Sequence, residues 1–140
     1  MVKLIWKYKD GEVSTKVPPL SVYGFVYELI LKDGSRYIGK KAFWGTTKKP
    51  LTKAEAEARP TKRHKLWKSV TKESKWRDYT SSSKLFGSRE VVEKRIVGLA
   101  KSKRHLTYLE TRMMFQKDVL ENDLYLNDNI GGRFFRDKLI

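Results

Sequence analysis

The sequence predicts an α+β (mixed α/β) domain in which a small central antiparallel or mixed β-sheet is flanked by helices. Three observations support this prediction: two hairpin signatures lie before residue 41, an alternating segment spans 91–100, and an amphipathic helix follows. The length of 140 residues suits one domain with a modest core. We expect residues 1–140 to form that single domain, with an N-terminal hairpin extension over 1–20 and a basic insertion over 44–76.

Each predicted hairpin has an Asp-Gly turn between segments of β-favouring residues, which is a strong signal for a tight connection. The second hairpin is the stronger of the two, because Tyr23 to Leu31 is rich in residues that favour strands. Pro18-Pro19 ends the first hairpin, since proline cannot donate a ladder hydrogen bond. The predicted arms are 3–8 with 12–17 around Asp10-Gly11, and 23–31 with 35–40 around Asp33-Gly34.

The segment from Thr46 to Trp76 is basic and polar, and it predicts short helices. Thr52-Lys53-Ala54-Glu55 has the spacing of a capping box, and Pro60 would end the helix that it opens. A second short helix is predicted over 70–78. Ser81 to Ser83 would cap a further helical turn that reaches Phe86.

Residues 91–120 predict a strand followed by the longest helix of the chain. Residues 91–100 alternate, although imperfectly, and are predicted as a strand. Leu106, Leu109 and Met113 recur at helical spacing within 105–120, and Asn122 offers a stop.

Charge indicates the class of partner. The chain has 31 Lys and Arg against 16 Asp and Glu, a formal net charge of +15. Such an excess favours a polyanion, and nucleic acid is the first candidate. No apolar run is long enough to span a membrane, and no stretch joins a clean apolar face to a basic one, so we expect no membrane partner. The absence of a signal-peptide pattern predicts a cytoplasmic protein, in the host cytoplasm if a phage encodes it.

Metal chemistry is restricted by composition. The chain has no cysteine, which excludes disulfides and thiolate zinc sites. Two histidines, His64 and His105, are too few for a histidine-rich metal cage.

The second hairpin carries a tyrosine on each arm, Tyr27 and Tyr37, and cross-strand neighbours lie about 5 Å apart. Gly39 lies within the second arm, where a glycine often permits a close approach. Phe25-Val26-Tyr27 followed by Tyr37-Ile38-Gly39 resembles the paired motif of the GIY-YIG nucleases. The chain departs from that pattern at Phe25, where the family has glycine, and Gly24 stands one position earlier.

Three further segments follow in the order that the resemblance requires. Tyr79, which follows Trp76-Arg77-Asp78 and precedes a serine-rich stretch, matches a third aromatic site position. Glu110 on the long helix matches the single metal-binding glutamate, and Asn127 or the nearby Asn129 matches the asparagine that closes the site. The resemblance covers 23–132 and implies the GIY-YIG nuclease fold, with these side chains meeting on one concave surface. Free-standing and homing-type members occur in phages, so we expect a phage source.

The family's arginine has no obvious counterpart, because its expected neighbourhood, Thr46 to Lys49, has lysines but no arginine. Arg63, Arg77 and Lys41 are the candidates. Of the two arginines we prefer Arg63, because it lies in a basic cluster upstream of Tyr79.

The resemblance implies hydrolysis of a DNA phosphodiester by one divalent ion, Mg²⁺ with Mn²⁺ as the alternative. Glu110 would bind the ion, since Mg²⁺ keeps several waters and needs few carboxylates. Tyr37 or Tyr27 would act as the base; a tyrosine pKa of about 10 requires nearby positive charge for that role. The expected products carry 5′-phosphate and 3′-hydroxyl ends.

The remaining positive charge predicts the DNA contact. Lysines contact phosphates without reading sequence, so we expect limited specificity, or specificity supplied by a homodimer on DNA or by a partner. Trp44, Trp67 and Trp76 could stack on bases or pack inside the protein. The alternative function is a non-catalytic basic protein, either a decayed nuclease or an RNA-associated one. The predicted DNA-binding residues are Lys40, Lys41, Lys48, Lys49, Lys62, Lys65, Arg77 and Lys84.

Overall fold

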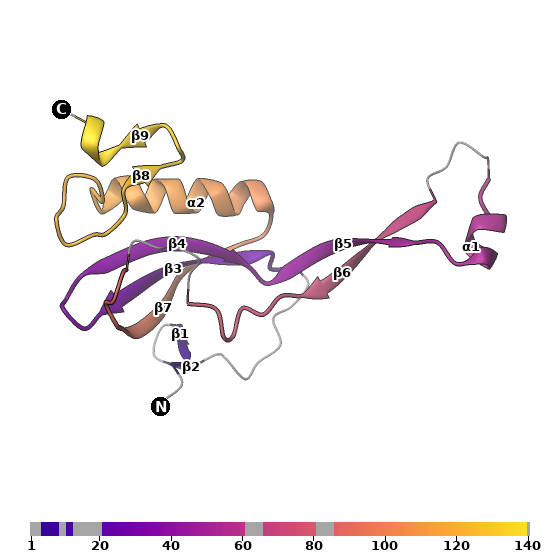
Figure 1. Cartoon of the computed structure of the whole chain (residues 1–140), viewed down its shortest axis with the longest axis horizontal. Coiled ribbons are helices and arrows are strands. Elements are labelled where there is room, and N and C mark those ends of the chain that lie inside the picture. Colours follow the sequence, from indigo (N-terminus) through magenta and orange to yellow (C-terminus); the bar gives the residue numbers. More distant parts are fainter. Residues whose placement is uncertain (1–3, 9–10, 13–20, 61–65, 81–85, 140) are drawn as a thin grey trace.

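The computed structural model describes residues 4–8, 11–12, 21–60, 66–80 and 86–139. Its centre is a five-stranded mixed sheet, in which β3 runs antiparallel to its neighbours β4 and β7 (Figure 1). This arrangement confirms the predicted α+β class. The strands are β1 Trp6–Tyr8, β2 Gly11–Glu12, β3 Gly24–Leu31, β4 Arg36–Ala42 and β7 Val91–Ala100, in the spatial order β2-β1-β7-β3-β4.

The first predicted hairpin is present in its described part, although Gly11, which was predicted as a turn residue, lies in strand β2. β1 pairs antiparallel with β2 in the register Tyr8↔Gly11, while residues 13–17 lie outside the described ranges. β1 also pairs in parallel with β7, a contact that the hairpin signature gave no sign of. The second hairpin forms as predicted, with Tyr27 opposite Gly39 across the β3–β4 ladder.

The long helix α2 spans Lys103–Gln116. It begins two residues before the predicted start because the Ser102 side chain accepts a hydrogen bond from the backbone N–H of His105. It ends four residues before the predicted stop, where Lys117 caps it and Asp118 adopts a φ of 50°.

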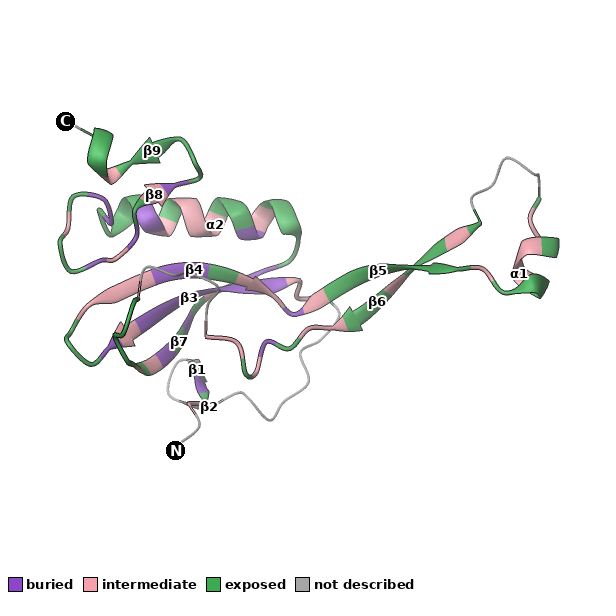
Figure 2. Ribbon diagram, viewed as in Figure 1, coloured by how far each residue is buried: buried purple, intermediate pink, exposed green. Residues whose placement is uncertain are grey.

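The sheet has two covered faces (Figures 1 and 2). Val26 and Ile38 point to the face on which α2 packs through Leu106 and Met114. Successive residues of a strand point to opposite faces, so their neighbours on β3 and β4 point the other way. That second face carries a cluster of buried and half-buried aromatic rings, which we call the aromatic face: Trp6, Phe25, Tyr27, Tyr37, Phe43, Trp76, Tyr79 and Phe86.

The basic insertion forms an extension that we call the arm, residues 44–60 and 66–73. It consists of β5 Trp44–Pro50, α1 Lys53–Glu57 and β6 Trp67–Glu73. The capping box at Thr52 is confirmed in full. The helix predicted over 70–78 is wrong: those residues form the end of β6 and a turn, because the β-branched Val70 and Thr71 pair with β5. The helical turn predicted up to Phe86 falls mostly on residues that are not described.

The C-terminal segment returns alongside α2. β8 Asn129–Ile130 and β9 Phe134–Phe135 form a small hairpin, and the 3₁₀ helix η1 spans Arg136–Lys138. The connecting Gly131 and Gly132 have φ values of 60° and 68°, a region that favours glycine. Among the helices of the described ranges, none has the length and apolar character needed to cross a membrane.

Candidate active site

Tyr27 lies directly over Gly39, on the neighbouring strand. A Cβ atom at Gly39 would lie 2.4 Å from both Cζ and the hydroxyl oxygen of Tyr27, so only glycine leaves room for that ring. Gly24 is equally restricted, since its Cβ would lie 2.5 Å from the carbonyl oxygen of Lys41. Phe25, which departs from the motif, is fully buried on the aromatic face. In the first half of the motif, the backbone position that has no room for a side chain is therefore Gly24, one residue before Phe25.

The three predicted site tyrosines come together on the aromatic face. The ring of Tyr27 lies 6.4 Å from that of Tyr37 and 6.1 Å from that of Tyr79, measured between centroids. Tyr27 is 2% exposed, whereas Tyr37 is half-buried and packs edge-on against Phe86. Solvent therefore reaches Tyr37 more readily than Tyr27, although their rings are neighbours.

Two lysines contact the Tyr79 segment. Lys41 Nζ lies 4.4 Å from the centroid of the Tyr79 ring, a cation–π distance. Lys94 is 2% exposed and donates hydrogen bonds to the backbone carbonyls of Tyr79 (2.8 Å) and Arg77 (3.2 Å). Its Nζ also lies 4.5 Å from the Trp6 ring centroid. Lys94 therefore holds the Tyr79 segment against the sheet; the sequence showed it only as one residue of an alternating strand.

Glu110 lies on the opposite face of the sheet, where α2 packs. Its Oε1 is 3.9 Å from Nζ of Lys40, which also donates a hydrogen bond to the Thr107 hydroxyl at 3.0 Å. The Glu110 side chain is 17% exposed. Burial raises the pKa of Glu110 above the usual carboxyl value, and the positive charge of Lys40 opposes that shift only in part.

The structure therefore does not bring the glutamate and the tyrosines onto one face. The physical reason is the alternation of β4: Tyr37 and Gly39 face the aromatic cluster, so Lys40 between Gly39 and Lys41 faces α2. β4 is the outermost strand of the sheet, so its outer edge is where the two faces meet.

Asn127 covers part of that edge. Its side-chain amide donates to the carbonyl of Ile38 (2.8 Å), and its side-chain oxygen accepts from the Ile38 N–H (3.0 Å). The residues just before Asn127 form a short parallel bridge to β4: the Arg36 N–H donates to the Leu124 carbonyl, and the Leu126 N–H donates to the Arg36 carbonyl. The side-chain amide of Asn127 continues this bridge at Ile38. Asn129 instead accepts from the N–H of Gly132 in the turn that follows.

A buried network holds the Asn127 segment in place. Tyr125 donates to Glu28 (2.9 Å), which also accepts from Arg36 (2.6 Å). Burial, with the hydrogen bond to Glu28, raises the pKa of Tyr125 to about 12. Arg136 donates to the backbone carbonyls of Tyr125 and Asn127 at 2.7 and 2.9 Å. The sequence does not indicate this structural role of Arg136, because its hydrogen-bond partners are backbone carbonyls of a segment about ten residues earlier.

The candidates for the arginine role lie in different places. Arg77 is paired with Glu73 and lies over the Trp76 ring, 4.6 Å from its centroid. Arg63 is not among the described residues. Lys41 is the candidate that the structure places beside the tyrosines.

The predicted DNA-binding lysines fall into three groups. Lys40 and Lys41 lie on opposite faces of β4, as described above. Lys48 and Lys49 lie on the arm, where Lys48 Nζ is 4.3 Å from the Trp67 ring centroid. Lys62, Lys65 and Lys84 lie outside the described residues.

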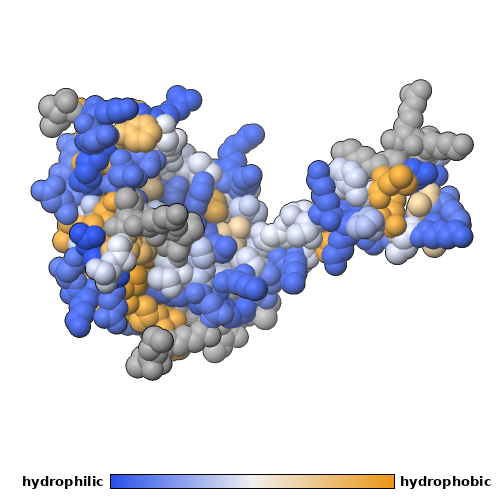
Figure 3. All heavy atoms as spheres, in the orientation of Figure 1, coloured by the Kyte–Doolittle hydropathy of each residue, from blue (hydrophilic) through white to orange (hydrophobic). Residues whose placement is uncertain are grey.

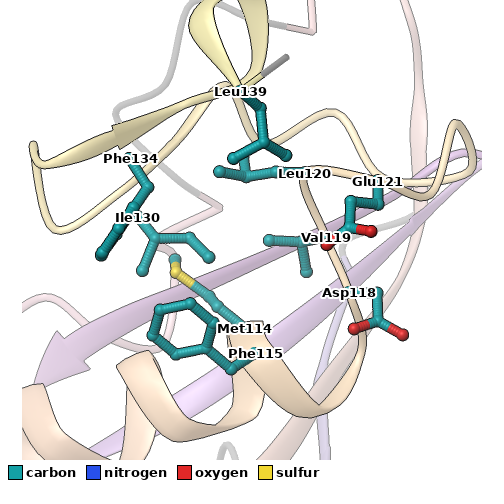
Figure 4. Close-up of a pocket in the computed structure, with 9 residues that line it drawn as sticks. All are labelled: Met114, Phe115, Asp118, Val119, Leu120, Glu121, Ile130, Phe134 and Leu139. Carbon is teal, nitrogen blue, oxygen red and sulfur yellow. The ribbon is translucent and has the colours of Figure 1, made fainter.

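A separate hollow lies between the C-terminal end of α2 and the β8–β9 hairpin (Figure 4). Its volume is about 60 Å³, and its lining is mainly apolar, with side chains that include Met114, Phe115 and Phe134. Such a lining does not suit a phosphate group. This hollow is therefore not a candidate for the reaction centre.

Comparison with protein families agrees with the motif order. Residues 6–130 match the family model described as "Putative endonuclease segE, GIY-YIG domain". The chain belongs to this GIY-YIG family. A search of curated proteins and a search of solved structures each gave no match. Membership in the GIY-YIG endonucleases implies a nuclease with DNA as its substrate class.

GIY-YIG nucleases are typically metal-dependent. Across the described ranges no three acidic or histidine side chains gather as a multidentate site. Mg²⁺ does not need such a cluster, because one or two carboxylates with water and phosphate oxygens complete its shell. Lys40 Nζ stays 3.9 Å from the Glu110 carboxylate, beyond hydrogen-bond distance, so this contact leaves the carboxylate able to hold a hydrated ion.

Proposed function

We propose that this chain is a Mg²⁺-dependent DNA endonuclease whose reaction centre lies at the outer edge of β4. The observation that carries the proposal is the position of Glu110, a mostly buried acid beside the motif strand. Tyr37 and Lys40 point to opposite faces of that strand, so a centre that uses both must lie at its edge. Asn127 acts as a positioning residue that fixes this edge at Ile38.

Each residue has a stated part in the reaction. Glu110 holds the ion, which when bound neutralises negative charge that develops on the phosphate. Lys41 and Lys40 bind phosphate oxygens from the two sides of β4. Tyr37 takes the proton of the attacking water, because it is more exposed than Tyr27 and has Lys41 within its cluster. Tyr27 and Tyr79 set the position of the Tyr37 ring, and Arg63 remains a candidate for a further phosphate contact.

The first experiment is cleavage of supercoiled plasmid with Mg²⁺, with EDTA as the metal-free control. We expect Glu110→Gln to lower the cleavage rate by at least about 100-fold, since even outer-shell changes at metal sites cost 10–100-fold. Glu121→Gln is the matched control, because Glu121 is exposed beyond the end of α2. Normal cleavage by Glu110→Gln would refute the role of Glu110. A wild-type chain that binds DNA without cutting it would instead support a non-catalytic protein.

Thermal stability gives a readout that does not depend on cleavage. The folded-state pKa of Glu110 is raised, so its ionisation opposes folding: the stability of the protonated form is lost as pH rises through that raised pKa. Glu110→Gln should therefore raise Tm at neutral pH without metal, and this gain should fade as pH drops below the ordinary carboxyl pKa. Added Mg²⁺ should raise the Tm of the wild type and not of the variant.

A double variant tests whether both faces serve one centre. Residues that act as a unit show grossly non-additive losses. Tyr37→Phe combined with Glu110→Gln should cut DNA no more slowly than the slower single variant. Multiplied losses would mean two independent contributions and would contradict a shared centre at the β4 edge.

A further inference from the structure

The arm is an antiparallel ribbon that projects away from the sheet (Figure 1). β5 and β6 pair along seven residues each, from Trp44↔Glu73 to Pro50↔Trp67, and form a sheet of two strands. At about 3.3 Å per residue the ribbon is roughly 20 Å long. A space-filling view shows the arm as a projection beyond the body, with hydrophilic residues along it and a hydrophobic patch at its distal end (Figure 3).

The ribbon carries lysines on both of its faces. Opposed residues of an antiparallel pair point the same way, so Lys49, Lys68 and Lys72 share one face. Lys48 lies on the other face, over the Trp67 ring at 4.3 Å. Serine and threonine side chains fill the positions between them, and those of Thr46, Thr47, Ser69 and Thr71 are exposed.

The acids of the arm are partly neutralised within the protein. Glu55 pairs with Lys68 at 2.8 Å, and Glu73 pairs with Arg77 at the base of the ribbon. The described part of the arm has more basic than acidic side chains. The basic ones are Lys48, Lys49, Lys53, Arg59, Lys68 and Lys72, and the acidic ones are Glu55, Glu57 and Glu73.

The ribbon is not built around a core of its own. None of the residues of β5, α1 or β6 is buried. A two-stranded hairpin is marginally stable in water without packing partners. A long, narrow and basic ribbon with small polar side chains therefore suits a partner that surrounds it with negative charge.

We propose that the arm enters the major groove of duplex DNA and anchors the enzyme beside the bond that it cuts. This proposal rests on the proposed function for the identity of the polymer. The major groove, about 12 Å wide, admits a two-stranded β-ribbon. A ribbon of this length would follow roughly six base pairs, at 3.4 Å each. Lysines on both faces would contact phosphates on both walls, and the hydroxyl side chains would face the base edges.

The test measures affinity without cleavage. Lys49→Gln combined with Lys72→Gln removes two positive charges from one ribbon face, and these residues are not directly opposed in the ladder. Lys32→Gln combined with Lys117→Gln is the matched control, since both are exposed on the body. Fluorescence anisotropy with a labelled 30-bp duplex (a length of about 100 Å) is recorded in EDTA at several salt concentrations.

We expect the arm variant to bind about tenfold or more weakly at 0.1 M salt, and its log–log salt slope to fall by about 2, or 0.9 per lost phosphate contact. The control pair should stay within about threefold of the wild type. Equal losses in the two pairs would overturn the proposal, because the effect would then come from net charge alone.

Two further readouts identify the groove. Methylation of guanine N7, which lies in the major groove, should weaken binding of the wild type and not of the arm variant. Duplex RNA has a deep, narrow major groove, so the arm variant and the wild type should bind it equally. The absence of N7 interference, or an equal loss on duplex RNA, would contradict groove insertion.

Cleavage separates this proposal from the proposed function. At saturating protein with Mg²⁺, the arm variant should cut bound plasmid within about threefold of the wild-type single-turnover rate. If the wild type does not cut at all, the proposed function fails while the anisotropy result still decides the role of the arm. A loss of cleavage rate on fully bound DNA would contradict an anchoring role.

Discussion

The strands β3 and β6 are similar in length and both are paired antiparallel, yet they have opposite environments. Seven of the eight residues of β3 are buried, whereas no residue of β6 is. One face of β3 packs against α2, and its other face packs within the aromatic cluster. β3 also carries Tyr27, whose ring lies so close to β4 that a Cβ atom at Gly39 would clash with it. β6 faces solvent on both sides. The body therefore packs the candidate site side chains tightly, whereas the arm presents its charged side chains to solvent.

The largest expected effect separates rate from affinity. Tyr37→Phe should lower the cleavage rate by about 100-fold or more, the usual contribution of a general base. It should leave DNA affinity within about threefold of the wild type, the reverse of the arm variant. The measurement is single-turnover plasmid cleavage with Tyr108→Phe, an exposed tyrosine of α2, as the control. Unchanged cleavage by Tyr37→Phe would contradict the role of Tyr37 as the base.

Lys94 tests how the body holds Tyr79. Lys94→Met keeps the side-chain length but removes the donor to the carbonyls of Arg77 and Tyr79, so we expect a loss of about 2 kcal/mol in the free energy of unfolding. Lys72→Met on the exposed arm should change it by less than about 0.5 kcal/mol. Urea denaturation measures both. Equal small losses would mean that the buried ammonium group is no more important than a surface one.

Glycines test the difference in packing. Gly39→Ala would place Cβ 2.4 Å from atoms of Tyr27, and overpacking of this kind should destabilise the protein by about 1–3 kcal/mol. Gly45→Ala on the arm meets its nearest atom at 3.9 Å and should be neutral or slightly stabilising. The free energy of unfolding measured in urea compares the two. A destabilising Gly45→Ala would show that the arm is packed against the body.

Helix caps give the smallest effect. Ser102→Ala removes the cap of α2 and should lower the free energy of global unfolding by about 1 kcal/mol. Thr52→Ala removes the capping box of α1, which has no buried residue, so we expect faster hydrogen exchange in α1 with an unchanged global Tm. A matching drop in Tm for both variants would mean that the arm and the body unfold as one unit.

Local signals predicted much of the body. The Asp-Gly turn, the strand at 91–100 and the helix at 105–120 depend on nearby residues, and each is present in the structure. The strand has the predicted bounds, whereas the helix spans Lys103–Gln116. The arm was predicted less well. The local pattern predicts a helix at Val70 and Thr71, whereas these residues pair with Thr47 and Thr46 on β5. Pairing between residues so far apart in the sequence leaves little local signal.

The candidate site shows the same division. The order of the motifs along the chain predicts the tyrosines and Asn127 as site residues. The structure places the three tyrosine rings together, with Asn127 on the adjoining edge of β4. The sequence predicts one concave surface that includes Glu110 and the tyrosines, whereas successive side chains of β4 point to opposite faces of the sheet. Glu110 therefore contacts Lys40 on the face opposite to the tyrosines. Lys94 and Arg136 were missed, because their importance comes from carbonyl groups that distant segments present to them.

The sequence by itself determined the family, the positive charge and the elements whose signals are local. Tertiary structure decided which face each side chain occupies, which strand forms the edge and how Asn127 completes it. The physical reason is that turns, caps and periodicity arise from interactions between near neighbours. Burial and the pKa of Glu110 depend instead on atoms that only the folded chain brings within a few ångströms.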